Sequence, residues 1–284
     1  MPVDVSVVIP ALNEADGITR QLRALDAQVF DSSWEVVVAD NGSTDDTRSV
    51  VESFQSKHFL LRWIDASGCP GINHARNEGV LKSVGNRILL CDGDDEVEPG
   101  WLSALADQLL TSDAVGGTLR FVEGGSGSSG PKERGPGDYY GFLVSPSGSN
   151  CGFTRDAFDA VGGFDESFFG GCDDTDFFWR VQLGGARFLS VPEARILKTQ
   201  RGGAREVFKQ QYRRGIQQPH LFQVHRRSGM SRRPLRVVIG SWGYLLFDLV
   251  TLLVRPRARM RLPGLAGKCF GRLIGSARYT TLYL

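Results

Sequence analysis

The sequence has few cysteines, and they show no regular spacing. Five cysteines are scattered over 284 residues, and none belongs to a C-x-x-C pair. An odd number without paired spacing argues against a disulfide framework and against a zinc site, so we expect a reducing compartment. The four histidines also fit no metal-ligand spacing and are interpreted as structural or surface residues.

The sequence also lacks a clear signal peptide and a long apolar run. A strand-like run begins already at Val3, so no leader is expected before it. The most apolar stretch, residues 237–254 (VVIGSWGYLLFDLVTLLV), has 18 residues and contains Asp248. That length is the lower limit for a membrane span, and a carboxylate in its middle is costly in hydrocarbon. With arginines on both sides, a helix in the membrane interface or packed in a core is favoured over a spanning one.

Basic residues are the minority in the first two thirds of the chain and acidic residues are nearly absent from the last third, although the net charge of the whole chain is only +1. Residues 1–197 contain 15 Lys and Arg and 30 Asp and Glu, whereas residues 198–284 contain 18 Lys and Arg and only Glu206 and Asp248 as acids. Such separation predicts a basic appendage that meets an anionic partner. The apolar run and the shortage of base-reading side chains favour an anionic membrane surface, and no nucleic-acid partner is expected.

The composition is otherwise that of a globular protein, with 41% hydrophobic and 23% charged residues. Short β-branched runs alternate with helical periods in the first 110 residues. Strands are predicted at 5–10, 34–40, 59–64 and 86–91, and helices at 14–27, 44–54, 72–84 and from Pro99 onward. This alternation predicts a mostly parallel sheet covered by helices on both faces.

Polar residues follow three of these strands, where a parallel sheet binds its ligands. The strand ends read PALNE at 10–14, DNGS at 40–43 and CDGDD at 91–95. Asp92 and Asp94 can present two carboxylates to one hard cation, Mg²⁺ or Mn²⁺, that bridges a diphosphate. A helix-capping cluster is the alternative, but a cap needs one aspartate and here there are three.

Five blocks in this order resemble the family 2 glycosyltransferases of the GT-A fold. They are VSVVIPALNEADGI, VVVADNGSTDDT, GINHARNEGV, ILLCDGDDEVEPGWL and GGFDESFFGGCDDTDFFWRV, and the resemblance covers about residues 3–200. It implies an α/β GT-A fold, a Rossmann-like, mostly parallel sheet flanked by helices, here with a basic helical C-terminal appendage. It also implies inverting transfer of one sugar from a nucleotide-diphosphate sugar, with a UDP-sugar favoured, to a hydroxyl acceptor.

The resemblance implies a donor site and a metal site. Asp94 matches a direct ligand of Mg²⁺ or Mn²⁺, Asp92 matches a residue near the ribose and the metal's water, and Asp40 matches an acceptor of a hydrogen bond from a uracil-type base. The donor-binding residues it implies are Pro10, Ala11, Leu12, Asn13, Glu14, Asp40, Asn41, Ser43, Arg76, Asn77, Asp92, Gly93 and Asp94.

The acceptor side implied by the resemblance contains Asn150, Gly171, Asp173 and Asp174. Asp174 matches the general base that deprotonates the attacking hydroxyl in a single displacement. Because the segment Gly170–Asp174 is one residue longer than the family pattern, Asp173 is the alternative base. Many relatives have a metal-binding histidine after the next strand, whereas this sequence has Lys198 there, which could instead meet the diphosphate.

The predicted organisation is a catalytic domain over 1–199 and a basic, partly apolar, membrane-associated region over 200–284. The catalytic domain divides into a nucleotide-sugar-binding half at 1–112 and an acceptor-binding half at 113–199, with a mobile loop at 123–141. We expect a cytoplasmic protein, peripheral on the inner face of the cell membrane, with a lipid-linked or cell-envelope acceptor.

Two other functions remain open from the sequence. A sugar nucleotidyltransferase shares the acidic α/β site, but its first loop should be Gly-rich and basic, unlike PALNE. A non-catalytic module that binds a sugar or a membrane would not require Asp94 and Asp174.

Overall fold

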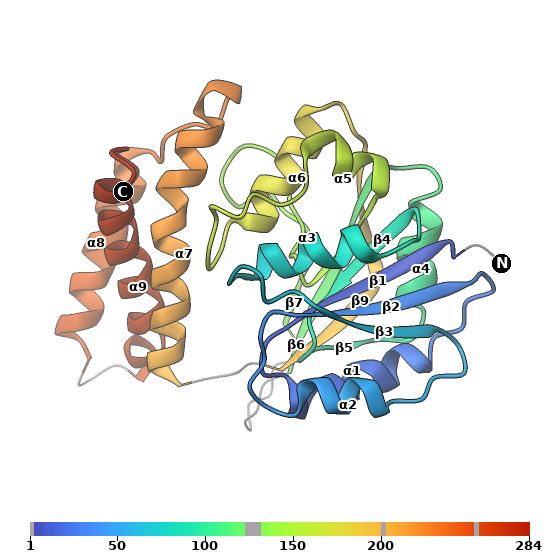
Figure 1. The fold of residues 1–284 in the computed structure, drawn as a ribbon. Coiled ribbons are helices and arrows are strands. Elements are labelled where there is room, and N and C mark those ends of the chain that lie inside the picture. The colour runs from blue at the N-terminus through green and yellow to red at the C-terminus, as the bar shows by residue number, and fades with distance from the viewer. Residues whose placement is uncertain (1–2, 123–131, 200–202, 253–255) are drawn as a thin grey trace. The chain divides into compact units, whose positions relative to one another are not determined.

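The computed structural model describes residues 3–122, 132–199, 203–252 and 256–284, which form two compact units (Figure 1). The first unit comprises Met1–Asp138, Leu143–Glu166 and Asp174–Gln200, and the second comprises Tyr139–Phe142, Ser167–Asp173 and Arg201–Leu284. Two short segments of the predicted catalytic domain therefore pack with the C-terminal helices instead.

The first unit is built on a mixed nine-stranded sheet in the order β3-β2-β1-β4-β8-β6-β9-β5, with β7 paired to β6. The α/β fold predicted from the sequence is confirmed. Four strands are mutually parallel: β1 (Val5–Ala11), β2 (Trp34–Asp40), β3 (Leu60–Asp65) and β4 (Arg87–Cys91). They agree with the predicted strands within one residue. In β1 and β2 every residue is buried, as expected for strands covered on both faces, whereas β3 is only partly buried.

The second half of the sheet is mostly antiparallel. β8 (Asn150–Thr154) runs antiparallel between β4 and β6 (Ala114–Val122), and β9 (Phe188–Thr199) runs parallel to β6. The short strands β5 (Glu96–Val97) and β7 (Lys132–Arg134) pair antiparallel with β9 and β6. The predicted loop at 123–141 is therefore wrong at 132–134, where the chain pairs as a strand, and its residues 123–131 lie outside the described residues.

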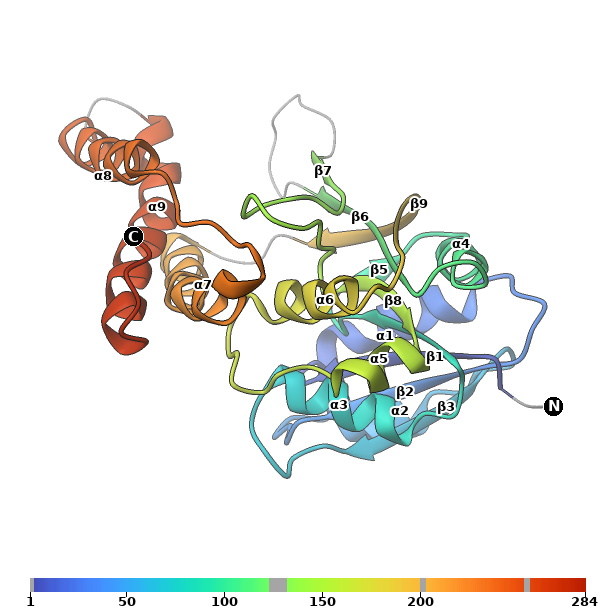
Figure 2. The same ribbon diagram turned by 90° about the horizontal axis from the view of Figure 1, so that it is seen from above.

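Helices cover both faces of this sheet (Figure 1 and Figure 2). They are α1 (Ala15–Asp26), α2 (Thr47–Ser53), α3 (Ile72–Lys82), α4 (Trp101–Gln108), α5 (Arg155–Val161) and α6 (Asp173–Leu183). Alternate residues of β1 point to opposite faces: Val7 and Ile9 pack in the core under α1, α2 and α4, and Val8 packs in the core under α3, α5 and α6. Helix α4 begins at Trp101 rather than at Pro99, because Gly100 before it is in the left-handed conformation.

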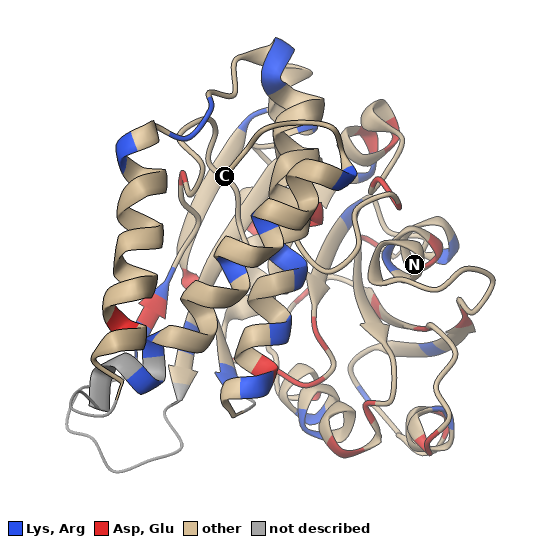
Figure 3. Ribbon diagram, turned by 90° about the vertical axis from the view of Figure 1, so that its left-hand side faces the viewer, with Lys and Arg blue, Asp and Glu red and all other residues tan. Residues whose placement is uncertain are grey.

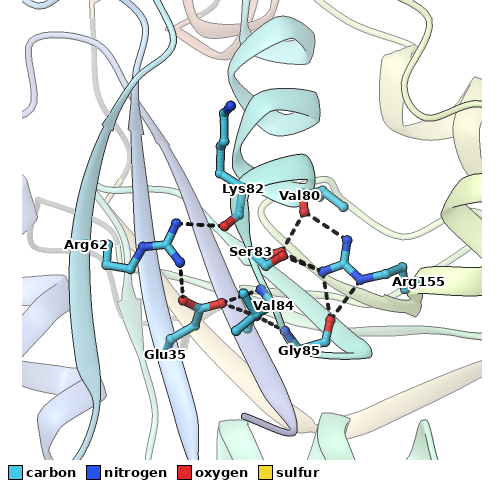
Figure 4. Close-up of polar contacts among 9 residues, drawn as sticks. Glu35, Arg62, Val80, Lys82, Ser83, Val84, Gly85 and Arg155 are labelled. Atoms are coloured by element: carbon cyan, nitrogen blue, oxygen red, sulfur yellow. Dashed lines mark hydrogen bonds and ion pairs between the residues drawn. The ribbon is translucent and has the colours of Figure 1, made fainter. Parts of the chain in front are cut away.

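A buried carboxylate fixes one end of the central strands (Figure 4). Glu35 on β2 is fully buried and accepts hydrogen bonds from the Ser6 hydroxyl at 2.7 Å and the Val84 amide at 2.7 Å. The Arg62 guanidinium donates to its other oxygen at 3.0 Å and to the Lys82 carbonyl at 2.7 Å. Every oxygen of the buried acid is thus paired, as burial requires.

Arg155 closes the end of α3 in the same region. Its guanidinium donates to the carbonyls of Val80, Ser83 and Gly85 at 2.8–3.1 Å. These carbonyls lie at the negative end of the helix dipole, where a cation is favoured. The network positions α3, whose other end reaches the site described below.

The second unit consists mainly of three helices, α7 (Ala204–His225), α8 (Leu235–Val250) and α9 (Pro256–Arg278). Helices α7 and α9 approach closely at glycines: a Cβ on Gly271 would lie 2.4 Å from the Tyr212 carbonyl, and one on Gly275 would lie 2.4 Å from the Ile216 carbonyl. Helix α8 contains residues 237–250 of the apolar run. Among the described helices, none combines the length and the apolar character needed to cross a membrane.

Candidate active site

A pocket of about 370 Å³ lies at the carboxyl ends of β1, β2 and β4. Its volume is in the range of small-molecule sites. Eight of the predicted donor-binding residues line it: Pro10, Ala11, Leu12, Glu14, Asn41, Asp92, Gly93 and Asp94. Segment 70–72 and Ala75 at the start of α3 form the remaining wall. The strand ends that the sequence singled out therefore converge on one cavity.

Other predicted donor residues hold the walls of this pocket in place. Asn13, with a φ of 56°, donates its amide to the Ser43 hydroxyl at 2.9 Å and accepts from the Thr44 amide at 2.8 Å. The Asn41 side chain accepts from the Gly71 amide at 2.7 Å and donates to the Ala66 carbonyl at 2.6 Å. These contacts tie together three loops that are distant in the sequence.

Three carboxylates gather at the end of β4. Ligand oxygens of Asp92, Asp94 and Asp95 all lie within 4.8 Å of one another. One oxygen of Asp92 and one of Asp95 are buried without a hydrogen-bond partner among the described residues. A buried carboxylate oxygen without a donor is costly unless a cation pairs with it. The cluster therefore fits a hard divalent cation such as Mg²⁺ or Mn²⁺.

Lys198 on β9 supplies a fixed positive charge beside this cluster. Its ammonium donates to Asp95 at 2.6 Å and to Asp92 at 3.2 Å, and lies 3.5 Å from the Ser149 hydroxyl. Burial alone would lower the pKa of Lys198, but the charges of Asp92 and Asp95 outweigh it and hold that pKa above its ordinary value. Burial, and then the charge of Asp92, raise the pKa of Asp95 to about 7 against the opposing effect of Lys198. Lys198, which the sequence suggested could meet the diphosphate, contacts Asp92 and Asp95 in this structure.

The predicted base, Asp174, contacts Gly148, and the next residue, Ser149, contacts Lys198. Asp174, in the first turn of α6, accepts a hydrogen bond from the Gly148 amide at 3.0 Å and from the Thr175 amide at 2.7 Å. A Cβ on Gly148 would lie 2.6 Å from a guanidinium nitrogen of Arg76, so a side chain there would displace this end of Arg76. Gly148 therefore contacts Asp174 through its amide and lies beside Arg76, and its neighbour Ser149 lies 3.5 Å from the Lys198 ammonium.

The alternative base, Asp173, ends the segment Ser167–Asp173 of the second unit. It is 8% exposed. Gly171 has a φ of 138°, and a Cβ there would lie 3.0 Å from the Arg214 side chain. Cys172 also has a positive φ of 66°, and its sulfur lies 3.4 Å from the Tyr140 hydroxyl. The loop before the bases is thus shaped by its contacts with the helical unit.

Two predicted site residues are used inside the fold. Asn150 is fully buried on β8, where its side chain accepts from the Trp101 indole and donates to the Thr118 and Ala194 carbonyls. Asn150 was expected on the acceptor side; in the structure these three hydrogen bonds hold its side chain between the sheet and α4. Asn77 likewise pairs with the backbone of Phe164 in both directions, at 2.9 Å each way.

Asp40 lies close to the donor pocket without being one of its lining residues. It ends β2 and is 4% exposed. Its oxygens accept from the Ser43 amide at 2.8 Å and the Trp63 indole at 3.1 Å. These two donors orient the carboxylate at the strand end beside Asn41, which does line the pocket.

Sequence reasoning missed three contributors to the site. Gly148 and Ser149 carry no sequence signal beyond a Gly/Ser-rich stretch. Gly17 on α1 is the third, since a Cβ there would lie 3.0 Å from the Asp94 Cα. Such close approaches are visible only once the helix and the strand end have been placed together.

Comparison with known proteins agrees with this geometry. The family model described as Glycosyl transferase family 2 matches residues 6–162. The glycosyltransferase AglE of Haloferax volcanii is 33% identical over 128 residues, which cover 44% of this chain and 42% of that protein. The GalNAc(5)-diNAcBac-PP-undecaprenol beta-1,3-glucosyltransferase of Campylobacter jejuni is 30% identical over 101 residues, which cover 35% and 32%. The matched regions thus span less than half the length of these relatives.

A solved structure extends the likeness to nearly the whole chain. The mannosyltransferase PcManGT of Pyrobaculum calidifontis, in complex with GDP-Man and Mn²⁺, superimposes with a TM-score of 0.67 at 18% identity, covering 97% of this chain and 89% of that one. At this identity the likeness shows the fold. Since the family model spans more than half of the sequence, the chain belongs to glycosyl transferase family 2.

Proposed function

We propose that this glycosyltransferase moves one sugar, with inversion, from a nucleotide-diphosphate sugar to an acceptor hydroxyl. The observation that carries the proposal is the continuity of the site: Gly148 contacts Asp174, and Ser149 contacts Lys198 beside the acidic cluster. A donor held at the cluster is then within reach of a base on α6. The match to glycosyl transferase family 2 argues against the two alternative functions, a sugar nucleotidyltransferase and a non-catalytic binding module.

The donor site is the pocket lined by the first loop, Asn41 and the acidic strand end. Asp94 and Asp92 would hold Mg²⁺ or Mn²⁺, which when bound offsets the negative charge that develops on the leaving diphosphate. Lys198 keeps Asp92 and Asp95 in place and offsets part of their mutual repulsion. Arg76, a buried donor-side residue on α3 whose guanidinium lies beside Gly148, adds a second positive charge near the reacting groups.

The acceptor hydroxyl is deprotonated by Asp174. Two amides, of Gly148 and Thr175, orient its carboxylate. A single displacement needs a base on the side opposite the leaving group, and such a base typically contributes about 10²–10⁴-fold in rate. Asp173 remains the alternative because of the extra residue in the preceding loop.

The acceptor is proposed to be lipid-linked or part of a cell-envelope glycan. The named relative from Campylobacter jejuni acts on an undecaprenol-linked substrate. The second unit is strongly basic (Figure 3), and most large apolar side chains of α8 are exposed. Both features support a peripheral protein at an anionic membrane surface, on the cytoplasmic face where nucleotide sugars are made.

A donor screen tests the proposal. Thermal unfolding is followed with UDP-, GDP- and dTDP-sugars, each with and without Mn²⁺. A UDP-sugar at about 100 times its Kd should stabilise the protein by about 2.7 kcal/mol, and only with Mn²⁺. Stabilisation by a GDP-sugar instead would contradict the UDP preference derived from Asp40, and stabilisation by no nucleotide sugar would contradict the function.

A further inference from the structure

The second unit contains a groove larger than the donor pocket. It has a volume of about 780 Å³ and is lined by one face of each helix, α7, α8 and α9. On α8 the lining positions include 237, 240, 241, 244 and 248, which recur with the spacing of one helix face. Since a rise of 1.5 Å per residue applies to a helix, these positions span roughly 16 Å. The groove is therefore long enough for a chain-like ligand.

Positive charge dominates the polar lining. Among the described residues that line the groove, Arg236, Arg261 and Lys268 stand beside one acid, Asp248. Asp248 is fully buried and is neutralised by Arg261, whose guanidinium donates to both carboxylate oxygens at 2.5 and 3.1 Å. Arg236 forms no ion pair with a described residue. The groove thus offers unbalanced positive charge to a ligand.

A polar atom in the groove also lacks a partner. The side-chain oxygen of Gln211 on α7 is buried and has no hydrogen-bond partner among the described residues. The amide of glutamine can present either its oxygen or its nitrogen after a flip. A ligand with a hydroxyl or an anionic oxygen can therefore satisfy it.

Apart from Ser241, whose hydroxyl donates to the Val237 carbonyl, the remaining described lining is apolar or glycine. Val237, Tyr244 and Leu265 provide apolar walls. Nothing lies within 4 Å of the position where a Cβ of Gly240 would be, so this glycine leaves the groove open. One phosphate group would fill only a small part of such a space.

We propose that this groove binds an amphiphile, with its phosphate or diphosphate group at the cations and the first part of its hydrocarbon chain along α8. This inference rests on the proposed function, because the amphiphile is then the lipid-linked acceptor or its carrier. Nucleic acid fits the groove less well, because the groove offers one aromatic ring, Tyr244, for base stacking.

Binding of decyl phosphate, below its micelle concentration, to the full-length protein tests the groove by calorimetric titration. Inorganic phosphate and decyl maltoside are the two reference ligands, since each carries one half of the chemistry. We expect decyl phosphate to bind at least tenfold more tightly than either. Equal affinity of inorganic phosphate, or of decyl maltoside, would overturn the proposal, because it would show a plain anion site or a nonspecific apolar surface.

Two glycine variants provide the matched comparison. Gly240→Leu fills the groove, whereas Gly243→Leu adds the same side chain to α8 outside the groove, also with nothing within 4 Å of its Cβ. Both remove a glycine from a helix interior, which favours folding equally. Gly240→Leu should weaken decyl phosphate binding at least tenfold, and Gly243→Leu should leave it within twofold. Unchanged binding in Gly240→Leu, or an equal loss of binding in both variants, overturns the inference.

The outcome is separable from that of the donor screen. The Mn²⁺-dependent response to UDP-sugars depends on the first unit and should be the same in both glycine variants. If that response is absent while Gly240→Leu still loses decyl phosphate, the groove stands and the proposed function fails. If the response is present and decyl phosphate does not bind, only the groove inference fails.

Discussion

Lys198 and the three aspartates around it set the electrostatics of the candidate site. The ammonium contacts one oxygen each of Asp92 and Asp95, while the other oxygen of each is buried without a partner in the described part of the chain. A single lysine cannot neutralise three carboxylates, so the cluster retains negative charge that attracts a cation. The same lysine holds two of the carboxylates in place before a cation arrives.

The choice between the two candidate bases is tested by paired variants. Asp174→Asn should lower turnover by about a hundredfold or more, the usual scale for a general base, while UDP affinity stays the same. Asp173→Asn should have a mild effect. The readouts are turnover of the donor and calorimetric titration with UDP. A severe loss in Asp173→Asn with a mild one in Asp174→Asn would transfer the role to Asp173.

Among individual residues, the sequence predicts those that directly follow a parallel strand. It does not predict residues that are distant in the sequence and come into contact only in the folded chain. The first loop, Asn41 and Asp92–Asp94 line one pocket because each directly follows a parallel strand. Lys198 is more than 100 positions from Asp92 and Asp95, and it comes beside them because β5, which directly follows Asp95, pairs with β9. The resemblance places Asn150 near the acceptor, yet a sequence pattern does not tell which face of a strand its side chain occupies.

Among the elements, β2 and α3 depend on the buried Glu35. Arg62→Ala leaves this carboxylate buried without its cation, whereas Glu35→Gln removes the charge and keeps an oxygen for Ser6 and Val84. Because Arg62 is partly exposed, we expect a loss of about 2 kcal/mol in the free energy of unfolding for Arg62→Ala, below the range for fully buried pairs. Glu35→Gln should cost less, about 1 kcal/mol. Urea unfolding measures both, and the reverse order would contradict this reading of the network.

A side chain of helix α7 packs against the loop Ser167–Asp173, which directly precedes Asp174. His220 stacks between Phe168 and Tyr279, with ring centroids 4.4 and 4.5 Å apart. His220→Ala removes this stack and should loosen Ser167–Asp173, lowering turnover about tenfold with unchanged UDP affinity, because small misplacements of a reacting group are costly. His220→Phe keeps a stacked ring and should restore most of the turnover. Equal losses in both variants, or a parallel loss of UDP affinity, would argue against a positioning role.

Elements with a strong local pattern are predictable, and those defined by pairing are not. Strand β2 is predicted with its observed bounds, Trp34–Asp40, because its hydrophobic run is continuous. Strand β7 consists of the charged residues Lys132–Arg134 in a Gly/Ser/Pro-rich stretch, and it forms because β6 offers an edge. The glycines of α9 are spaced for close contact with α7. This contact is not predicted, because the prediction for this region rests mainly on its charge.

For the whole molecule, the separation of charge predicts where each unit acts. The acidic first unit contains the cation site, and the basic second unit carries α8. Each Lys or Arg near an anionic leaflet contributes about 1 kcal/mol of attraction, so a few of the 18 suffice for binding at low salt.

Vesicle binding tests this separation. The protein should sediment with phosphatidylglycerol vesicles at low salt and should be released at about 1 M salt, where the Debye length is about 3 Å. Leu246→Asp, on the exposed surface of α8, should weaken binding strongly, whereas Leu60→Asp, at a similarly exposed leucine of the first unit, should not. Equal binding to uncharged vesicles, or equal effects of the two substitutions, would contradict a role for the basic unit.

We propose that the carboxylates at the end of β4 bind a divalent cation that in turn binds the nucleotide diphosphate. The most direct measurement is a calorimetric titration of UDP into the wild-type protein and into Asp94→Asn, each with and without Mn²⁺. We expect Mn²⁺ to tighten UDP binding at least tenfold in the wild type and to have no effect in Asp94→Asn, whose thermal unfolding remains cooperative. The same Mn²⁺ enhancement in both proteins would contradict it.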